Sequence, residues 1–274
     1  MAFTFDFSNK NVLVVGGTSG INRGVAETFA KAGARVAVVS RSQEKVDDTV
    51  QSLKNYGAAD ATGFSADVRE VDAIKTGIDK IAADWGALDV VVSGAAGNFP
   101  ALAMGMSPNG FRSVIEIDLL GTFHVMQAVY PHLKKPGASI INISAPQAEI
   151  PMAGQSHVCA AKAGVDMITR TLCPEWGIEG VRINSIIPGP IDNTEGMKRL
   201  APTDGLRAAV TKSVPLQRMG TTDDIANACL FLASDLASYI SGVVIPVDGG
   251  WAQGGAAVVG AGLAEMLKAT PKNK

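Results

Sequence analysis

A glycine-rich segment near the amino terminus carries the first residues whose types and spacing point to chemistry. The sequence Gly16-Gly17-Thr18-Ser19-Gly20-Ile21 follows a short apolar run directly and precedes a segment of helical periodicity. Glycines at such a junction let the backbone turn tightly and approach a diphosphate, whose charge then faces the amino end of the helix. Because the loop lies at the first expected strand–helix junction, it favours dinucleotide binding over an ordinary turn.

The end of the second apolar run carries Ser40 and Arg41, where dinucleotide-binding folds place the residues that recognise the adenosine ribose. An acidic residue there would bind the ribose hydroxyls of NAD, whereas a basic residue neutralises the 2′-phosphate of NADP. No Asp or Glu occupies this strand end, and Arg23, just after the glycine loop, is a second candidate charge. The local chemistry therefore predicts NADP(H).

The elements that must hold these residues alternate between short apolar, β-branched runs and longer helical patterns. Several runs are apolar on both faces, which is typical of a parallel sheet covered by helices on both sides. The βαβα order predicts a single-domain Rossmann-type doubly wound parallel sheet with right-handed crossovers. The expected strands are Asn11–Val15, Arg35–Val39, Asp89–Val92, Ser139–Ile143, Val181–Ile187 and Val243–Val247.

Helical periodicity predicts two long helices, over Met106–Leu133 and Ala161–Trp176, and Gly33 is expected to end the first helix. The stretch 189–215 is rich in Pro, Gly and charge, and we expect a mobile substrate lid or an irregular insertion there. After about residue 250 a C-terminal extension contains a weak helical pattern near Leu263–Lys268. No linker or repeat divides residues 1–274, so we expect a single domain.

Composition narrows the classes of function. The formal net charge of −2 gives no general attraction to nucleic acid or anionic lipid, and neither partner is expected. No apolar run reaches membrane-spanning length, and the first ten residues lack the pattern of a secretory signal, so we expect a cytoplasmic protein. The cysteines have no short pair spacing and predict neither a disulfide framework nor a metal site; they are Cys159, Cys173 and Cys229.

The chain resembles the short-chain dehydrogenase/reductases over almost its whole length. This resemblance implies that Asp67 and Val68 border the adenine and that Ala95, Ala96 and Gly97 line the cofactor channel. Asn22 stands where that family usually has Gly. The matching residues are the Gly16 to Gly20 loop, Asp67-Val68, Ala95-Ala96-Gly97, Lys162, Asn184 and Pro188-Gly189, and Pro188, Gly189 and Ile191 would pass beside the nicotinamide.

The active-site positions of that family are altered here. The family normally uses Tyr-x-x-x-Lys, in which the tyrosine donates a proton to a carbonyl oxygen. The lysine lowers the pKa of that phenol and holds the nicotinamide ribose. Lys162 is retained, but Val158 occupies the tyrosine position, Ala145 the serine position and Asp118 the asparagine position. Reduction of ordinary ketones by the family mechanism is therefore not expected.

The altered pattern is similar to that of the 2,4-dienoyl-CoA reductases, particularly the peroxisomal type, which carry an Asp and a Lys without the Tyr. Shared segments include Gly97-Asn98-Phe99, Thr194-Glu195-Gly196 and a histidine, His157, five residues before Lys162. The resemblance implies NADPH-dependent reduction of a 2,4-dienoyl-CoA to a 3-enoyl-CoA, as in unsaturated fatty acid β-oxidation. Hydride would enter at C5, and the resulting dienolate would be protonated later at carbon.

The resemblance assigns the catalytic role to Asp118 and Lys162. Lys162 would also order the nicotinamide ribose. Asp118 would either position a water as the immediate acid or itself carry the proton, if burial raises its pKa. Both alternatives are open from the sequence, and His157 is a further candidate for proton transfer or for a wall of the site.

Coenzyme A carries several phosphates and an adenine, so its site needs basic and stacking residues. By resemblance, Arg41, Arg69 and Arg199 would meet the phosphates or the adenosine. Phe99, Ser107 and Asn109 would flank the pantetheine or the acyl chain. Arg41 would then serve the cofactor, the substrate or both.

Two other functions fit the same sequence. One is a short-chain reductase acting on a different enoyl thioester or carbonyl compound, and the other is a non-catalytic NADP(H)-binding sensor. The resemblance also implies a homotetramer, because this family generally assembles through two long helices that would otherwise leave apolar surface exposed.

Overall fold

Seven short strands pair in parallel to form one sheet, in the order β3-β2-β1-β4-β5-β6-β7. The structure, a computed structural model, describes residues 5–269. Strand order reverses between β1 and β4, which creates the crevice where doubly wound folds bind ligands. The strands are β1 (Asn11–Val15), β2 (Arg35–Ser40), β3 (Asp60–Ser65), β4 (Val90–Ser93), β5 (Ser139–Ile143), β6 (Arg182–Pro188) and β7 (Val244–Val247).

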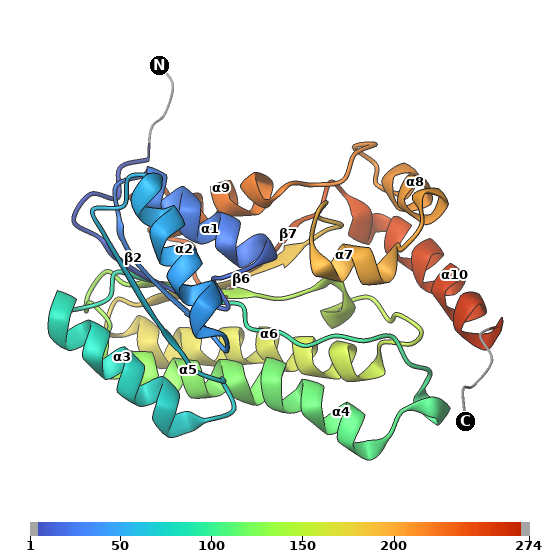
Figure 1. Ribbon diagram of the computed structural model, residues 1–274, viewed down its shortest axis with the longest axis horizontal. Helices are drawn as coiled ribbons and strands as arrows, with labels where there is room; N and C mark the ends of the chain where they lie inside the picture. Colours follow the sequence, from blue (N-terminus) through green and yellow to red (C-terminus); the bar gives the residue numbers. More distant parts are fainter. Residues whose placement is uncertain (1–4, 270–274) are drawn as a thin grey trace.

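Helices cover both faces of this sheet (Figure 1). Alternate residues of one strand enter opposite cores: Val12 and Val14 pack in one apolar cluster, and Leu13 and Val15 pack in the other. This two-sided burial explains the continuous apolar runs of the sequence. One face is covered by α1 (Gly20–Lys31), α2 (Gln43–Asn55) and α9 (Thr222–Ala233), and the other by α3 (Val71–Trp85), α4 (Pro108–Val114), α5 (Gly121–Val129) and α6 (Ser156–Gly177).

A third group of helices lies beyond one end of the sheet, at the right of Figure 1. It contains α7 (Glu195–Leu200), α8 (Asp204–Ser213) and α10 (Gly255–Ala269). The stretch expected as an irregular insertion therefore forms two capped helices: the Thr194 hydroxyl accepts from the Met197 N–H and the Thr203 hydroxyl from the Leu206 N–H. The C-terminal helix is also longer than its weak pattern indicated.

Two other expectations are corrected by the structure. The edge strand β3 was not predicted, because Asp60–Ser65 has few apolar residues and includes Gly63. The long helix expected over Met106–Leu133 begins at Pro108, after Ser107 caps it, and is interrupted by a π-helical segment at Ile115–Leu120. Gly33 does follow the end of α1, with a φ of 84°.

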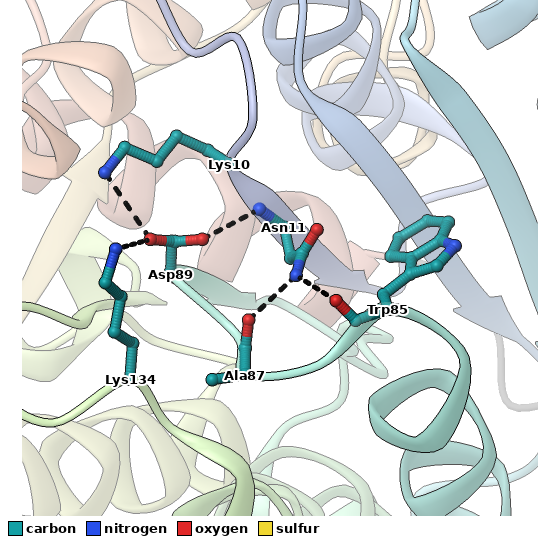
Figure 2. A network of polar contacts seen from close by, with 6 residues as sticks. All are labelled: Lys10, Asn11, Trp85, Ala87, Asp89 and Lys134. Atoms are coloured by element: carbon teal, nitrogen blue, oxygen red, sulfur yellow. Dashed lines mark hydrogen bonds and ion pairs between the residues drawn. The ribbon is translucent and has the colours of Figure 1, made fainter.

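The amino ends of the central strands are fixed by a polar network centred on the buried residues Asn11 and Asp89 (Figure 2). One Asp89 carboxylate oxygen accepts from the Asn11 backbone N–H at 3.0 Å, and the other lies 3.4 Å from Lys10 Nζ and 3.1 Å from Lys134 Nζ. The Asn11 side-chain amide donates to two backbone carbonyls at the end of α3, those of Trp85, its last residue, and Ala87, at 2.9 Å each. These contacts join the amino edge of the sheet to the end of α3. The candidate site lies at the opposite edge, where the strands have their carboxyl ends.

Candidate active site

Two cavities adjoin along the carboxyl edge of the sheet, on either side of the β1–β4 crevice. Their volumes are about 260 Å³ and 340 Å³. They share the lining residues Ser19, Asn22, Gly94 and Ala96, so together they form one elongated site. The first cavity extends toward β2 and is called the adenosine cavity below. The second extends toward α6 and β6 and is called the reaction cavity.

The glycine loop lies between these cavities and is packed tightly against β4. Gly16 has a φ of 78°, and a Cβ on it would lie 3.0 Å from the Ala95 nitrogen. A Cβ on Gly17 would lie 2.8 Å from the Val14 carbonyl oxygen. The Ser19 side chain, at the N-cap of α1, makes no capping hydrogen bond. The first-turn N–H groups of α1 are therefore available to a diphosphate.

The adenosine cavity carries positive charge at the end of β2. Ser40 and Arg41 line it, and so does Lys45 in the first turn of α2. Asp67 and Val68, which follow β3, line the opposite part of the same cavity. Sequence reasoning missed Lys45, although its position four residues after Arg41 at the start of a helix could have drawn attention to it. Two cations here suit a phosphorylated ribose.

Two other arginines near this end are already paired with carboxylates. Arg23 Nη1 lies 2.7 Å from Asp48, and its Nε lies 2.9 Å from Glu27. Arg23 does not line the adenosine cavity or the reaction cavity. Arg69 lies 2.7 Å from Asp67 and holds the pKa of that carboxyl below its usual range. The suggested role of Arg23 as a second phosphate ligand is therefore not supported, because its charge is compensated within the fold.

The reaction cavity contains the Asp118–Lys162 pair. Lys162 Nζ lies 3.5 Å from Asp118 Oδ2, and the exposed fractions of the two side chains are 6% and 1%. Lys162 Nζ also donates to the Ile143 carbonyl oxygen at 2.9 Å, which holds it at the end of β5. The two charges come from α6 and from the π-helical segment, and burial makes each depend on the other.

The Asp118 carboxyl has two different oxygens. Oδ1 accepts a hydrogen bond from the Gly97 backbone N–H at 2.6 Å. Oδ2 is buried without a hydrogen-bond partner. Burial raises the pKa of Asp118, against the opposing effects of the Lys162 charge and the Gly97 N–H. A π-helical turn often accompanies a functional site, and here it carries the carboxyl that faces the cavity.

The walls beside this pair carry no phenol. Val158, one helical turn before Lys162, lines the reaction cavity and is 3% exposed. Ser144 and Ala145 line it at the end of β5. A family-type proton donor to a ketone oxygen is therefore absent from the described residues that surround Lys162.

His157 lies behind this wall rather than on it. Its side chain is fully buried and its ring contacts the Phe99 ring edge-on, with centroids 4.5 Å apart. Burial lowers the pKa of His157, more strongly than the nearby backbone groups of Phe99 and Gln155 raise it. Neither residue lines the reaction cavity. The pair supports the loop after β4 that carries Gly97.

The residues expected to meet the substrate lie in different places. Arg199 on α7 donates to the Asn98 carbonyl oxygen at 2.9 Å and so joins α7 to the loop after β4. Ser107 accepts from the Gly110 N–H as the cap of α4, and Asn109 is exposed on the same helix. Ser107, Asn109, Arg69 and Arg199 do not line the adenosine or the reaction cavity.

The residues expected to bind the cofactor all border one of the two cavities. Around the adenosine cavity are Gly16, Thr18, Ser19, Ser40, Arg41, Asp67, Val68, Ala95 and Ala96. Around the reaction cavity are Gly20, Ile21, Gly97, Lys162, Pro188, Gly189 and Ile191. Sequence reasoning missed several residues of the reaction cavity that come from the C-terminal half or from turns without a motif, among them Gln147, Met197 and Trp251.

Comparisons with known proteins agree on the family. The model of a family described as "Enoyl-(Acyl carrier protein) reductase" matches residues 15–252. The chain is 41% identical to a peroxisomal (3E)-enoyl-CoA-producing 2,4-dienoyl-CoA reductase of Arabidopsis thaliana, over 87% of this chain and 83% of that one. It is also 41% identical to a Bacillus subtilis protein named a probable (2E)-enoyl-CoA-producing 2,4-dienoyl-CoA reductase, over 88% and 96%.

Solved structures agree as well. A short chain dehydrogenase from Bacillus anthracis is 38% identical and superposes with a TM-score of 0.78, covering 89% of this chain and 96% of that one. The matched family model spans both the glycine loop and the Asp118–Lys162 pair. This chain therefore belongs to the short-chain dehydrogenase/reductase family.

Proposed function

We propose that this protein uses NADPH to reduce a 2,4-dienoyl-CoA to a 3-enoyl-CoA. The observation that carries the proposal is the buried Asp118–Lys162 pair in a cavity where Val158 and Ala145 replace the usual proton-donating hydroxyls. Relatives named as 2,4-dienoyl-CoA reductases match most of the chain at about 40% identity, which supports the same reaction here. Oxidation of unsaturated acyl chains is the process in which such a reaction would serve.

The residues of the two cavities fit a nicotinamide dinucleotide with a 2′-phosphate. The tight packing of Gly16 and Gly17 leaves room for a diphosphate where any side chain would collide with β4 or β1. Arg41 and Lys45 would bind the 2′-phosphate, and Lys162 would bind the nicotinamide ribose. When bound, the reduced nicotinamide supplies the hydride of the reaction.

The chain's own residues then have to stabilise negative charge. Addition of hydride at C5 of the conjugated system moves electrons toward the thioester oxygen and gives a dienolate. The Lys162 ammonium, held by the Ile143 carbonyl and almost fully buried, supplies positive potential at the reaction cavity. An ionised carboxyl in this place would oppose the build-up of negative charge, so in this proposal Asp118 is protonated when the dienolate forms and Lys162 carries the positive charge.

The dienolate must take one proton at carbon to complete the reduction. Asp118 lines the reaction cavity, its Oδ2 has no hydrogen-bond partner, and burial raises the pKa of the group. We place the transferable proton on Oδ2, from which it moves to C2 directly or through one water. Protonation at C2 leaves the double bond between C3 and C4, which is the 3-enoyl product.

For the coenzyme A moiety, we propose Arg199 as a phosphate ligand at the mouth of the reaction cavity. Its hydrogen bond to Asn98 places its guanidinium where α7 meets the loop after β4. Arg41 and Arg69 are further candidates, although Arg69 has to exchange its ion pair with Asp67. Phe99, Ser107 and Asn109 would flank the pantetheine and acyl parts, and His157 would lie behind Phe99. Residues 189–215, which contain α7 and α8, would act as a lid that moves to let the substrate bind.

We also propose a homotetramer in the cytoplasm. Exposed apolar side chains on the helices after β4 and β5, Leu120, Phe123 and Met167, support assembly through these helices. The cysteines of the described residues are free, which suits a reducing compartment. Within residues 5–269, no helix is long and apolar enough to cross a membrane.

Product analysis with isotopes tests this reaction. The protein is incubated with 2,4-hexadienoyl-CoA and NADPH in D₂O, and the product is analysed by NMR. The proposal predicts a 3-hexenoyl thioester with solvent deuterium at C2 and none at C5. Deuterium at C4 of a 2-hexenoyl product would contradict the proposed site of protonation, and no reduction would contradict the proposed substrate.

A further inference from the structure

We infer that Asn22 is a cofactor-positioning residue whose side-chain oxygen accepts a hydrogen bond from a ribose hydroxyl of the bound dinucleotide. This inference rests on the proposed function in one respect, because it takes the two cavities to hold NADPH. It concerns a residue that departs from the usual family pattern, in which glycine occupies this position and no side chain can make the contact.

The inference starts from an unpaired atom in the middle of the site. Asn22 is the third residue of α1, is 8% exposed and lines both the adenosine cavity and the reaction cavity. Its Oδ1 is buried without a hydrogen-bond partner. A buried polar atom without a partner costs free energy, and such atoms usually find a partner in the functional complex.

The orientation of the Asn22 side-chain amide is fixed by the hydrogen bond that its NH₂ group donates. Asn22 Nδ2 donates to the Gly94 carbonyl oxygen at 2.8 Å. A carbonyl oxygen only accepts hydrogen bonds, so the NH₂ group must face Gly94 and the oxygen must face away from it. The unpaired atom is therefore an acceptor, and its partner in the complex must be a donor.

The chemistry of the dinucleotide then selects the partner. The diphosphate beside the amino end of α1 carries only acceptors at neutral pH. The adenine amino group and the nicotinamide carboxamide belong at the far ends, near Asp67 and near Ile191. The ribose hydroxyls are the donors next to the diphosphate, and Asn22 lines the part of the site that both cavities share, where a ribose beside the diphosphate would lie.

Gly94 is part of the same arrangement. A Cβ at position 94 would lie 2.4 Å from Asn22 Nδ2 and 2.6 Å from its Oδ1. Any side chain there would push the amide out of its place. A bare backbone at Gly94 is therefore the condition for placing an amide at position 22.

The test compares two buried asparagines on opposite edges of the sheet. Asn22→Ala removes the amide in the site, and Asn22→Gly gives a second variant that carries the usual family residue. Asn11→Ala is the matched control: Asn11 is 7% exposed, and its amide also donates to backbone carbonyls, but at the amino edge (Figure 2). Dissociation constants are measured without substrate, by NADPH fluorescence and by calorimetry with 2′,5′-ADP, alongside the melting temperature.

We expect both Asn22 variants to bind NADPH about 3- to 10-fold more weakly than the wild type, the effect of one lost neutral hydrogen bond. The Asn11→Ala variant should melt at a lower temperature and keep its NADPH affinity within about twofold. A loss shared by 2′,5′-ADP supports a contact to the adenosine ribose, and a loss confined to NADPH supports the nicotinamide ribose.

Unchanged NADPH affinity in folded Asn22→Ala and Asn22→Gly variants would overturn the inference and leave Asn22 as a filler of the space above Gly94. Failure of the wild type to bind NADPH is a different result: it would contradict the proposed function together with this inference. The two failures are thus distinguished by the wild-type titration alone.

Discussion

Asp118 Oδ2 and Lys162 Nζ lie 3.5 Å apart, and both side chains are almost fully removed from solvent. Neither group has bulk water to stabilise its ionised form, so the protonation of each depends on the other and on a few backbone groups. Val158, one helical turn before Lys162, lines the same cavity and has no proton to donate. A buried acid and a buried cation in one cavity are suited to stabilising and then protonating an anionic intermediate.

Replacing the Asp118 carboxyl by an amide tests its role as a proton donor separately from the binding of NADPH. Asp118→Asn keeps an oxygen for the Gly97 N–H but removes the transferable proton. We expect kcat for 2,4-hexadienoyl-CoA to fall about 100- to 10,000-fold, while the dissociation constant for NADPH changes little. Stopped-flow kinetics and fluorescence titration check the two quantities.

Lys162→Met provides the comparison for that variant. It should lower kcat and also weaken NADPH binding, since Lys162 would hold the nicotinamide ribose. An Asp118→Asn variant with near wild-type kcat would remove Asp118 from the proposed mechanism.

Arg41 should determine the preference for NADPH over NADH. The residue directly follows β2 and is exposed, it forms no ion pair with a carboxylate of residues 5–269, and Lys45 lines the adenosine cavity with it. Arg41→Ala should weaken NADPH binding about 10- to 100-fold, the effect of one lost charge-assisted contact, and leave NADH binding within about twofold.

Arg23→Ala is the matched control for this prediction. The Arg23 guanidinium lies against Glu27 and Asp48, outside the cavity. Its removal should leave both dissociation constants unchanged within about twofold. Equal losses of NADH and NADPH affinity in Arg41→Ala would show that Arg41 does not bind the 2′-phosphate.

His157 should make the stability of the fold depend on pH below neutrality. Burial lowers the pKa of this histidine. Between the folded and the unfolded pKa values, His157 is therefore neutral in the folded chain and protonated in the unfolded chain. Stability is then lost as the pH falls below the unfolded value of about 6.5, by up to about 1.4 kcal/mol per pH unit. His157→Phe keeps a ring against Phe99 and removes the titration.

Thermal melts between pH 5 and 8 check this. The melting temperature of the wild type should fall relative to that of the His157→Phe variant as the pH is lowered from 7 to 5. Above pH 7.5 the difference should be constant. Parallel curves over the whole range would mean that the pKa of His157 is not lowered by the fold.

Substitutions at Asn22 and Gly94, which are in close contact, should have non-additive effects on the free energy of unfolding. Gly94→Ala places a Cβ 2.4 Å from the Asn22 amide nitrogen and should lower stability by about 1–3 kcal/mol. In the Asn22→Gly background the amide is absent, and the same change should cost much less. Urea unfolding of the four chains gives the coupling energy, and additive effects would contradict the close packing.

The sequence predicted most of the central sheet from local hydrophobic patterns, and it predicted the pairing of Asp118 with Lys162 from a family pattern. Strands such as Asn11–Val15 are continuous apolar runs, and Asp118 and Lys162 occupy positions that a family pattern defines. The strand β3 lacks such a signal, because Asp60–Ser65 is stabilised by pairing with β2 rather than by its own composition. The π-helical segment at Ile115–Leu120 likewise has no signature in hydrophobic periodicity.

Long-range contacts explain the rest of what the sequence did not reveal. The pairing of Arg23 with Glu27 lies within one helix, but its second partner, Asp48, comes from α2. The orientation of the Asn22 amide is set by a carbonyl 72 residues away, at Gly94. The separation of His157 and Phe99 from the reaction cavity depends on tertiary packing, which residue types alone do not encode.

The most direct test of the proposed function is a substrate panel with the wild-type protein. Consumption of NADPH is followed at equal concentrations of 2,4-hexadienoyl-CoA, crotonyl-CoA and acetoacetyl-CoA. We predict turnover with the dienoyl thioester and little with the other two, because charge must reach the thioester oxygen through a conjugated diene and no tyrosine lines the reaction cavity to protonate a ketone. Tight NADPH binding with no turnover of the dienoyl thioester, or faster turnover of acetoacetyl-CoA, would contradict it.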